Sequence, residues 1–407
     1  MGEQDAFEAG RISYMSYEVL ARKYRPQTFS DVVGQDHVVD TLKNAIAQNR
    51  VAHAYLFVGP RGTGKTSTAR IFAKALNCEN GPSIDFDNEK DEICQEITVG
   101  NSLDVIEIDG ASNNGVDQVR ELRENAMFMP SRARFKIYII DEVHMLTNQA
   151  FNALLKTLEE PPPHVKFFFA TTEPMKVPAT ILSRCQRFDL RRISTREIVG
   201  RLRDICKAEK IKADEEALLA VARGAEGGMR DAQSALDQLI SFQGKNITEK
   251  DVLAVFGLVA HGKVEEIAEA TLKGDIPRMI DLIAEVDATG KDLYRLLIDL
   301  LEHFRNLLIL SYSNKTAHLA DLAETQVESL KAQLDLCDPG KVTRVVDILI
   351  ETEGRIRHAL SRRTLMEMAL IRAARSASLA SVDEILKELA AVKESLGSAD
   401  DSSKKKP

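Results

Sequence analysis

Residues 59–66 read Gly59-Pro60-Arg61-Gly62-Thr63-Gly64-Lys65-Thr66 and match the phosphate-binding pattern G-x-x-x-x-G-K-[ST]. The apolar run 54–58 before them is typical of a buried parallel strand, and residues 67–76 after them are rich in helix formers. Glycines let such a loop curl so that its amides point at phosphate oxygens, while the following helix contributes its positive end. We therefore expect these residues and the adjacent Ser67 to bind a nucleotide, with Lys65 facing the β- and γ-phosphates and Thr66 supplying an oxygen to Mg²⁺. A glycine-rich turn without a ligand is the alternative.

The sequence after this loop alternates between strand-like and helical segments. Strand-like runs at 104–108, 136–140 and 165–171 are separated by helical patterns such as 116–126 and 148–158. Alternation of this kind predicts an α/β fold in which a parallel sheet is covered by helices on both faces.

Polar residues end two of these strands. Asp141 and Glu142 follow the apolar run 136–140. Next to a phosphate loop, we expect Asp141 to hold Mg²⁺, directly or through water, and Glu142 to position and polarise the attacking water. Thr172 ends the following strand and is a candidate sensor of that water or of the γ-phosphate. The alternative for Thr172 is an ordinary β-branched strand residue.

The chain changes character after about residue 190, where strand patterns give way to helical ones. Helical patterns at 196–209, 215–224 and 229–242 predict a small helical domain, and stronger apolar patterns at 293–310 and 342–360 predict a further one. A capping box at 381–384 opens one more helix before a polar tail. The expected divisions are a disordered extension at 1–15, a nucleotide-binding domain at 16–190, helical domains at 191–248 and 249–375, and a C-terminal helix and polar tail at 376–407.

Composition limits the function classes that are open to the chain. The net charge is −8, whereas most nucleic-acid-binding proteins carry a basic surplus, so a role on DNA needs a local surface or partners. Solubility is the simpler explanation of the acidic balance. The five cysteines are an odd number without repeated spacing, which argues for a reducing compartment. No apolar run reaches the ~20 residues of a membrane span and we see no export signal, so we expect a cytoplasmic protein without membrane contact.

Six further motifs accompany the phosphate loop. They are Leu20-Ala21-Arg22-Lys23-Tyr24-Arg25-Pro26, Val32-Val33-Gly34-Gln35, Asp141-Glu142-Val143-His144-Met145-Leu146, Asn152-Ala153-Leu154-Leu155-Lys156-Thr157-Leu158-Glu159-Glu160-Pro161-Pro162, Ile181-Leu182-Ser183-Arg184-Cys185 and Gly228-Met229-Arg230-Asp231. With these motifs the sequence resembles the AAA+ clamp-loader ATPases, and most of all the gamma/tau family of bacterial DNA polymerase III. The resemblance is strong over about residues 16–257 and looser beyond them. It implies that residues 191–248 form a lid and residues 249–375 an oligomerisation collar.

The resemblance also implies roles for residues outside the phosphate loop. Ser183-Arg184-Cys185 is the family's signature for an arginine finger that reaches a neighbouring subunit's ATP. A guanidinium at Arg184 would neutralise charge on the transferring phosphoryl group, whereas a plain surface charge is the alternative. Arg230 matches the sensor arginine of the lid, which would couple lid closure to ATP. The residues that would border the adenine are Arg25, Pro26, Val33 and Gln35.

DNA contacts are expected at two helix starts. Ser112-Asn113-Asn114-Gly115 and Thr147-Asn148 offer free backbone amides to phosphates. Contacts of this kind do not depend on base sequence and tolerate an acidic chain. Ordinary helix capping by these residues is the alternative.

A zinc module is implied by the resemblance, because related chains carry four cysteines after the phosphate-loop helix. Cys78 and Cys94 match the first and fourth of these, while Asn88 and Asp91 stand at the middle positions. Two thiolates with one carboxylate and one amide are a poor structural zinc site, since soft ligands dominate such sites. We therefore expect no zinc and reduced thiols at Cys78 and Cys94. The alternative is a weakened site that Asp91 completes with a nearby acid such as Asp87 or Glu92.

The function that these features predict is ATP-driven clamp loading within the DNA polymerase III holoenzyme, with ATP and Mg²⁺ as cofactors. The resemblance implies a ring-like pentamer with other clamp-loader subunits, which opens a sliding clamp and places it on primed DNA. A polymerase core is a further candidate partner, and the chain itself adds no nucleotides. Two alternatives are another AAA+ DNA-processing ATPase, such as a branch-migration motor, and a non-hydrolysing scaffold. The residues Lys65, Asp141, Glu142 and Arg184 argue against a scaffold, and the Ser-Arg-Cys motif argues against other motors.

Overall fold

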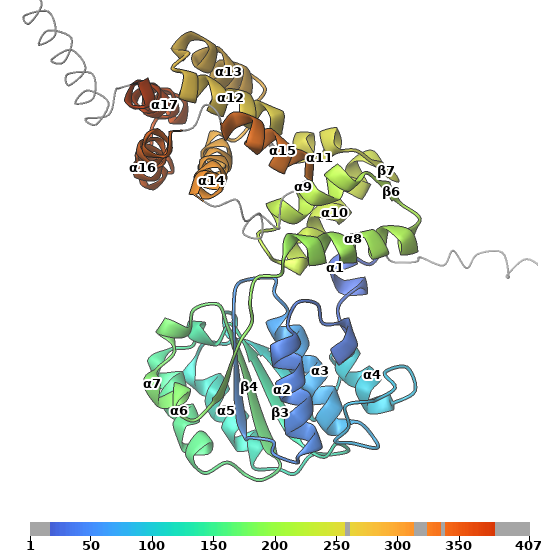
Figure 1. The fold of residues 1–407 in the computed structure, drawn as a ribbon. Helices are drawn as coiled ribbons and strands as arrows, with labels where there is room; N and C mark the ends of the chain where they lie inside the picture. The colour runs from blue at the N-terminus through green and yellow to red at the C-terminus, as the bar shows by residue number, and fades with distance from the viewer. Residues whose placement is uncertain (1–16, 257–260, 313–323, 335–337, 379–407) are drawn as a thin grey trace, which may run out of the picture. The chain divides into compact units, whose positions relative to one another are not determined.

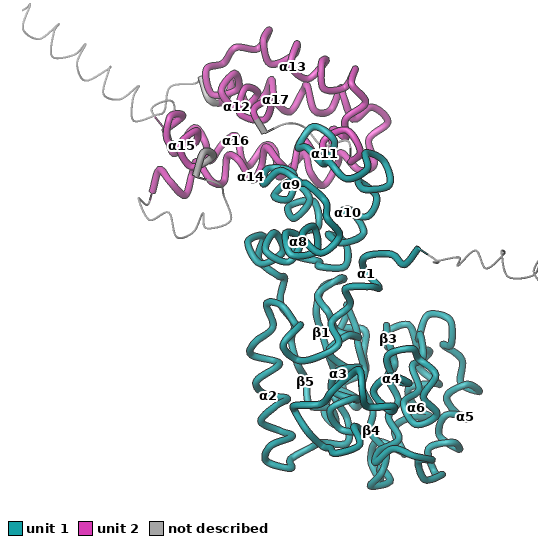
Figure 2. Tube along the Cα trace, turned by 90° about the vertical axis from the view of Figure 1, so that its right-hand side faces the viewer, with its two compact units in different colours: residues 1–252 teal, residues 253–407 magenta. Residues whose placement is uncertain are grey.

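The computed structural model describes residues 17–256, 261–312, 324–334 and 338–378. The chain divides into two compact units, residues 1–252 and 253–407, which are coloured separately in Figure 2. The extension expected at 1–15 and the helix and tail expected from 381 onward lie outside the described residues. Within the described part of the chain, no helix is both long enough and apolar enough to cross a membrane.

The first unit is built on a five-stranded parallel sheet, as the sequence predicted (Figure 1). The strand order is β2-β3-β4-β1-β5, and each neighbouring pair is parallel. The strand that leads into the phosphate loop is therefore flanked by β4 and β5. The strands are β1 (Ala54–Val58), β2 (Val105–Asp109), β3 (Lys136–Asp141), β4 (Val165–Thr171) and β5 (Gln186–Asp189).

Helices cover both faces of this sheet and form two separate cores. Along β1, Tyr55 and Phe57 pack into one core, while Leu56 and Val58 pack into the other. This alternation follows from the two-residue period of a strand and explains why β1 is apolar throughout. One core includes side chains of α2 (Asp36–Ala47), α3 (Lys65–Asn77) and α4 (Glu92–Val99); the other includes side chains of α5 (Val116–Ala126), α6 (Asn148–Glu159) and α7 (Ala179–Leu182).

A helical bundle completes the first unit after the sheet. A capping box opens α8, in which Ser194 and Glu197 satisfy each other's backbone amides. The short strands β6 and β7 pair in parallel, although we expected no strands in this region. The elements are α8 (Thr195–Glu209), β6 (Lys212–Ala213), α9 (Glu215–Gly224), α10 (Met229–Gln243), β7 (Asn246–Ile247) and α11 (Glu249–Val255), of which α11 crosses the division between the two units after residue 252.

The N-terminal segment of the described chain packs against this bundle. Helix α1 (Leu20–Lys23) contacts α10. Lys23 and Tyr24 both donate hydrogen bonds to Glu209 at 2.6 Å, and Tyr17 donates one to Asp237. The remaining short elements of the first unit are the 3-10 turns η1 (Phe29–Asp31), η2 (Val143–Met145) and η3 (Pro174–Lys176).

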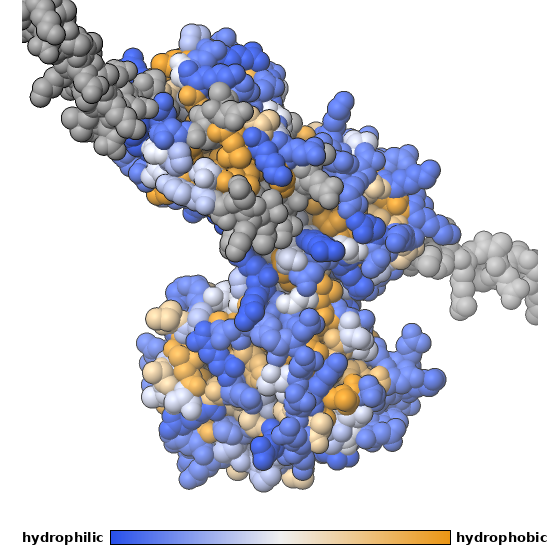
Figure 3. All heavy atoms as spheres, viewed as in Figure 1, coloured by the Kyte–Doolittle hydropathy of each residue, from blue (hydrophilic) through white to orange (hydrophobic). Residues whose placement is uncertain are grey.

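The described residues of the second unit are helical and share one apolar core, in agreement with the predicted all-helical character. Leucines of α14 lie along the side that faces this core. On the face shown in Figure 3, polar side chains cover most of the surface of both units. The helices are α12 (His261–Lys273), α13 (Ile276–Ala288), α14 (Leu293–Tyr312), α15 (Glu324–Gln333), α16 (Pro339–Ile356) and α17 (Arg362–Ser378).

Candidate ATP-binding site

The phosphate loop connects the end of β1 to the start of α3, as its pattern predicted. Gly64 precedes α3 with φ +100°, a conformation that L side chains rarely adopt. Gly62 has φ +76°, and a Cβ placed on it would lie 2.9 Å from the Cα of Gly228. The loop therefore needs glycine at both positions. Gly64 allows the backbone to curl, and Gly62 allows both the curl and the close approach of the helical bundle.

Lys65 is held at the loop and is almost fully buried. Its ammonium Nζ donates to the carbonyl oxygen of Pro60 at 2.9 Å, and only 6% of the residue is exposed. Burial lowers the pKa of Lys65, while the carboxylates of Glu142 and Asp141 act in the opposite direction. A buried cation that faces two carboxylates and a curled amide loop suits a polyphosphate ligand.

Oxygen ligands suitable for Mg²⁺ lie beside the loop. The hydroxyl of Thr66 donates to Asp141 Oδ2 at 2.6 Å, which brings together the two side chains predicted as metal ligands. Mg²⁺ prefers oxygen ligands and keeps several of its waters, so one hydroxyl and one carboxylate next to phosphates fit this ion. Glu142 adjoins Asp141 and donates its backbone N–H to Asp141 Oδ1 at 2.9 Å.

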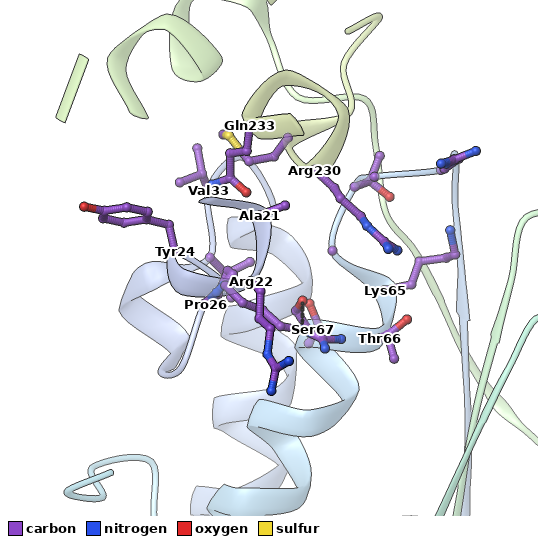
Figure 4. Close-up of a pocket in the computed structure, with 18 of the residues that line it drawn as sticks. Ala21, Arg22, Tyr24, Pro26, Val33, Lys65, Thr66, Ser67, Arg230 and Gln233 are labelled. Carbon is purple, nitrogen blue, oxygen red and sulfur yellow. Dashed lines mark hydrogen bonds between the residues drawn. The ribbon is translucent and has the colours of Figure 1, made fainter. Parts of the chain in front are cut away.

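A cavity of about 560 Å³ opens beside the loop within the first unit (Figure 4). Its walls come from the N-terminal segment, the phosphate loop, the middle of β2, the end of β3, and helices α8 and α10. Figure 4 shows Arg230 reaching from α10 toward the loop that carries Lys65 and Thr66. The predicted residues that line the cavity are Arg25, Pro26, Val33, Arg61, Gly62, Thr63, Gly64, Lys65, Thr66, Ser67, Asp141, Glu142 and Arg230.

Arg25 links the N-terminal segment to α3 at this cavity. Its Nε donates to the hydroxyl of Ser67 at 3.1 Å. Burial lowers its pKa to about 10, with Arg70 adding to the effect and Glu107 opposing it. At neutral pH the guanidinium stays charged, so the wall next to Ser67 is cationic.

The helical bundle contacts the loop directly. Arg61 forms an ion pair with Asp231, with Nε and Oδ1 3.6 Å apart, and the N–H of Arg230 donates to the carbonyl of Gly62. Arg230 and Asp231 lie in the first turn of α10, so the start of this helix contacts the phosphate loop at two places.

Other predicted residues lie apart from the cavity lining. Gln35 is fully buried, and its side-chain amide exchanges two hydrogen bonds with the backbone of Arg191. The hydroxyl of Thr172 lies 3.4 Å from Glu142 Oε2. The guanidinium of Arg184 donates from Nη2 to Glu159 Oε1 at 2.8 Å and from Nη1 to the carbonyl oxygen of Thr180. Gly59 and Pro60 belong to the loop but do not line the cavity either.

The two predicted DNA-contacting segments lie next to each other. The N–H of Thr147 donates to the carbonyl of Asn114 at 3.2 Å, so the starts of α5 and α6 are adjacent. Thr147 also caps α6 through its hydroxyl. Ser112 and Asn113 hydrogen-bond to Asp109 at the end of β2, and Gly115 and Asn148 complete the two segments.

The Cys78–Cys94 region uses its polar groups for protein contacts. Asp91 caps α4 by accepting the N–H of Cys94 at 2.9 Å, and its other oxygen accepts the N–H of Glu79. Asn88 accepts a hydrogen bond from the buried Lys74 at 2.6 Å. Burial raises the pKa of both thiols. Of the alternative acids, Asp87 pairs with Lys90 and Glu92 with Arg132. In the described part of the chain, no three His, Cys, Asp or Glu side chains are grouped to hold a metal.

The cavity also includes residues that we had not identified from the sequence. Glu107 contributes from β2, where Arg70 forms an ion pair with it, and Arg201 contributes from α8. Gln233 and Ser234 follow Arg230 by about one helical turn, so the spacing from the sensor arginine would have indicated them. No sequence motif singles out Glu107 or Arg201.

Comparison with protein-family models places three matches along the chain. Residues 34–194 match the model described as DNA polymerase III, delta subunit. Residues 197–245 match the DNA polymerase III clamp loader subunit, ATPase lid domain, and residues 247–389 match domain III of DNA polymerase III subunits gamma and tau.

Curated relatives extend these matches over most of the chain. The tau subunit of DNA polymerase III from Bacillus subtilis is 43% identical over 381 residues, which is 92% of this chain and 67% of that protein. The Escherichia coli tau subunit is 42% identical over 88% of this chain and 55% of its own length. The gamma subunit of Buchnera aphidicola subsp. Acyrthosiphon pisum is 39% identical over 88% of this chain and 99% of its own length. The chain thus spans about half to two thirds of these tau relatives, and it belongs to the gamma/tau subunit family of bacterial DNA polymerase III.

Proposed function

We propose that this chain is the ATP-hydrolysing subunit of a clamp loader, which uses ATP to open a sliding clamp and place it on primed DNA. One observation carries this proposal: a single cavity brings the phosphate loop, the carboxylates of Asp141 and Glu142 at the end of β3, and the arginine of α10 together. Each of these features is needed to bind, position and cleave a nucleoside triphosphate. The proposed reaction takes place on replicating DNA, so we place the protein in the cytoplasm.

Each residue of the cavity has its own role in the proposed reaction. The loop amides and Lys65 hold the phosphates, while Thr66 and Asp141 hold Mg²⁺, which when bound offsets charge on the phosphate oxygens. Glu142 orients the attacking water and accepts its proton, and Thr172, just beyond the end of β4, holds the carboxylate of Glu142. Because Lys65 leaves the Pro60 carbonyl to reach a phosphate, nucleotide binding alters the contact within the loop.

Arg184 and Arg230 connect this site to the rest of a ring-like hetero-pentamer. Arg230 reaches the cavity from α10, so we infer that α10 closes on bound ATP. Arg184 is absent from the lining of its own cavity and lies on the surface, with a third of its side chain exposed. This position supports a role for Arg184 at the ATP of a neighbouring subunit.

The starts of α5 and α6 form the proposed DNA contact. Their adjacency lets two sets of helix amides face one phosphate backbone, which binds DNA without reading its sequence. Only the short turn η2 and two further residues separate Glu142 from the start of α6. The proposed DNA contact at the start of α6 is therefore only a few residues away in sequence from the catalytic carboxylate.

ATP hydrolysis by the assembled complex separates this function from its alternatives. We expect the rate to rise about tenfold or more when primed DNA and clamp are added together, because both ligands favour the closed site. A branch-migration motor responds instead to a four-way junction and ignores the clamp. A scaffold does not hydrolyse ATP under any of these conditions, and either result would overturn the proposal.

We also propose that the Cys78–Cys94 region holds no zinc. Purified without chelator, the protein should contain far less than one zinc per chain by elemental analysis, because Asp91 and Asn88 are engaged by other groups. The double variant Asn88→Cys with Asp91→Cys, which restores four thiols, is a positive control for metal uptake. About one zinc per unmodified chain, lost in Cys94→Ser, would show that the proposal is wrong.

A further inference from the structure

Glu142, whose carboxylate must be directed toward the attacking water, has a strained backbone conformation. Its φ is +44°, in the left-handed region that non-glycine residues rarely adopt. Strain of this kind persists only where neighbouring groups hold the residue, and it concentrates at functional sites. The N–H of Met145 donates to the carbonyl of Glu142 at 2.9 Å, which fixes the backbone but leaves the carboxylate to be oriented.

The imidazole of His144 lies against this carboxylate. Its side chain is only 7% exposed, and Nδ1 lies 3.5 Å from Glu142 Oε2. The hydroxyl of Thr172, just beyond the end of β4, lies 3.4 Å from the same oxygen. Both contacts are made to Oε2, so Oε1 is the oxygen that is suited to accept a hydrogen bond from a water in the cavity.

The ring of His144 is itself fixed at both nitrogens. Nδ1 lies 2.9 Å from the hydroxyl of Thr171, and Nε2 lies 3.4 Å from Glu173 Oε1. Thr171 is fully buried at the end of β4, where its hydroxyl also accepts the N–H of Glu173. Lys176 pairs with Glu173 from the next turn. Because both ring nitrogens have partners, the orientation of the ring is fixed. The fixed ring can therefore restrict the orientation of the Glu142 carboxylate that packs against it.

We propose that His144 is a positioning residue for Glu142. It holds the Glu142 carboxylate at the angle that directs Oε1 toward the attacking water, and it does so from β4 through Thr171. This inference rests on the proposed function, in which Glu142 acts on that water. It assigns His144 no contact with ATP and no proton transfer of its own.

The test compares three variants of the full chain in the assembled complex. Asparagine carries a polar atom near the position of Nδ1, glutamine carries one near Nε2, and leucine carries neither. Because the contacts to Glu142 and Thr171 are made through Nδ1, His144→Asn should keep most of the kcat for ATP hydrolysis. His144→Gln and His144→Leu should lower kcat on the order of 10- to 100-fold with an unchanged KM for ATP.

Controls separate positioning from a role in folding. Thermal unfolding of all three variants is measured alongside, and His164→Leu serves as a matched control at a histidine whose Nε2 lies 3.2 Å from the carbonyl oxygen of Ala126. In a Glu142→Gln background, His144→Leu should cause no further loss, because it acts through Glu142. Equal kcat values for the Asn and Gln variants, or a wild-type kcat for His144→Leu, would overturn the proposal. Full activity of Glu142→Gln alone would instead overturn the role of Glu142 in the proposed function.

Discussion

Replacing Lys65 by alanine should abolish ATP hydrolysis while the protein remains folded. The ammonium is the cation that faces Asp141 and Glu142 across the phosphate loop, and it is the group that offsets phosphate charge. Removing one preorganised charge at a phosphoryl-transfer site lowers the rate on the order of 100-fold or more. The measurements are steady-state ATP hydrolysis by the complex and binding of a fluorescent ATP analogue to the purified chain.

The control is Lys207→Ala, which removes an exposed lysine on α8 whose side chain is 73% accessible. Lys207→Ala should hydrolyse ATP at the wild-type rate, and both variants should unfold at similar temperatures. Undiminished DNA-stimulated hydrolysis by a well-folded Lys65→Ala variant would remove the basis for a catalytic phosphate loop.

Arg184→Ala should leave ATP binding intact and lower hydrolysis in the assembly, by roughly 1000-fold if the arginine stabilises the transferring phosphoryl group as such fingers do. Its guanidinium contacts Glu159 and Thr180 on the surface and does not line the cavity of its own subunit, so binding to that cavity is unaffected. Arg187→Ala is the matched control, since Arg187 is an exposed arginine on the adjoining strand that pairs with Asp189.

Mixing two inactive variants tests whether Arg184 acts between subunits. A Lys65→Ala subunit retains its arginine, and an Arg184→Ala subunit retains its phosphate loop. When the two lie side by side in one complex, a complete site forms between them, so mixed complexes should regain part of the activity. If mixtures remain as inactive as each variant alone, Arg184 acts within its own subunit.

The strands that carry the site were predictable because they are buried on both faces. β1 and β4 have the predicted bounds, and every residue of both is buried. β5 was not predicted, since Phe188 is its only buried residue and the pattern of the strand is otherwise polar. β6 and β7 contain two residues each, which is too short for any periodicity to show.

The motifs identified the residues on the loop and strand ends, but not the contacts between distant parts of the chain. Gln35 was predicted to border adenine on the strength of its motif alone, and its amide is used by the backbone of Arg191. Asp91 was matched to a middle position of the family's zinc module, whereas in the structure its side chain caps helix α4. His144 belongs to the motif at residues 141–146, but nothing in that motif links it to Thr171 at the end of β4 or to Glu173 just beyond it.

The central claim, that ATP drives a clamp onto DNA, is tested most directly by measuring the clamp that remains on primed circular DNA after the loader complex is removed. A labelled clamp, primed circles and the assembled complex are incubated and then separated by gel filtration in salt that strips the loader. With ATP, the clamp should elute with the DNA, and linearising the circle should release it. With a non-hydrolysable ATP analogue, or with Lys65→Ala subunits, little clamp should remain on the DNA. Equal retention of the clamp without ATP, or no retention with ATP by an active complex, would contradict the claim.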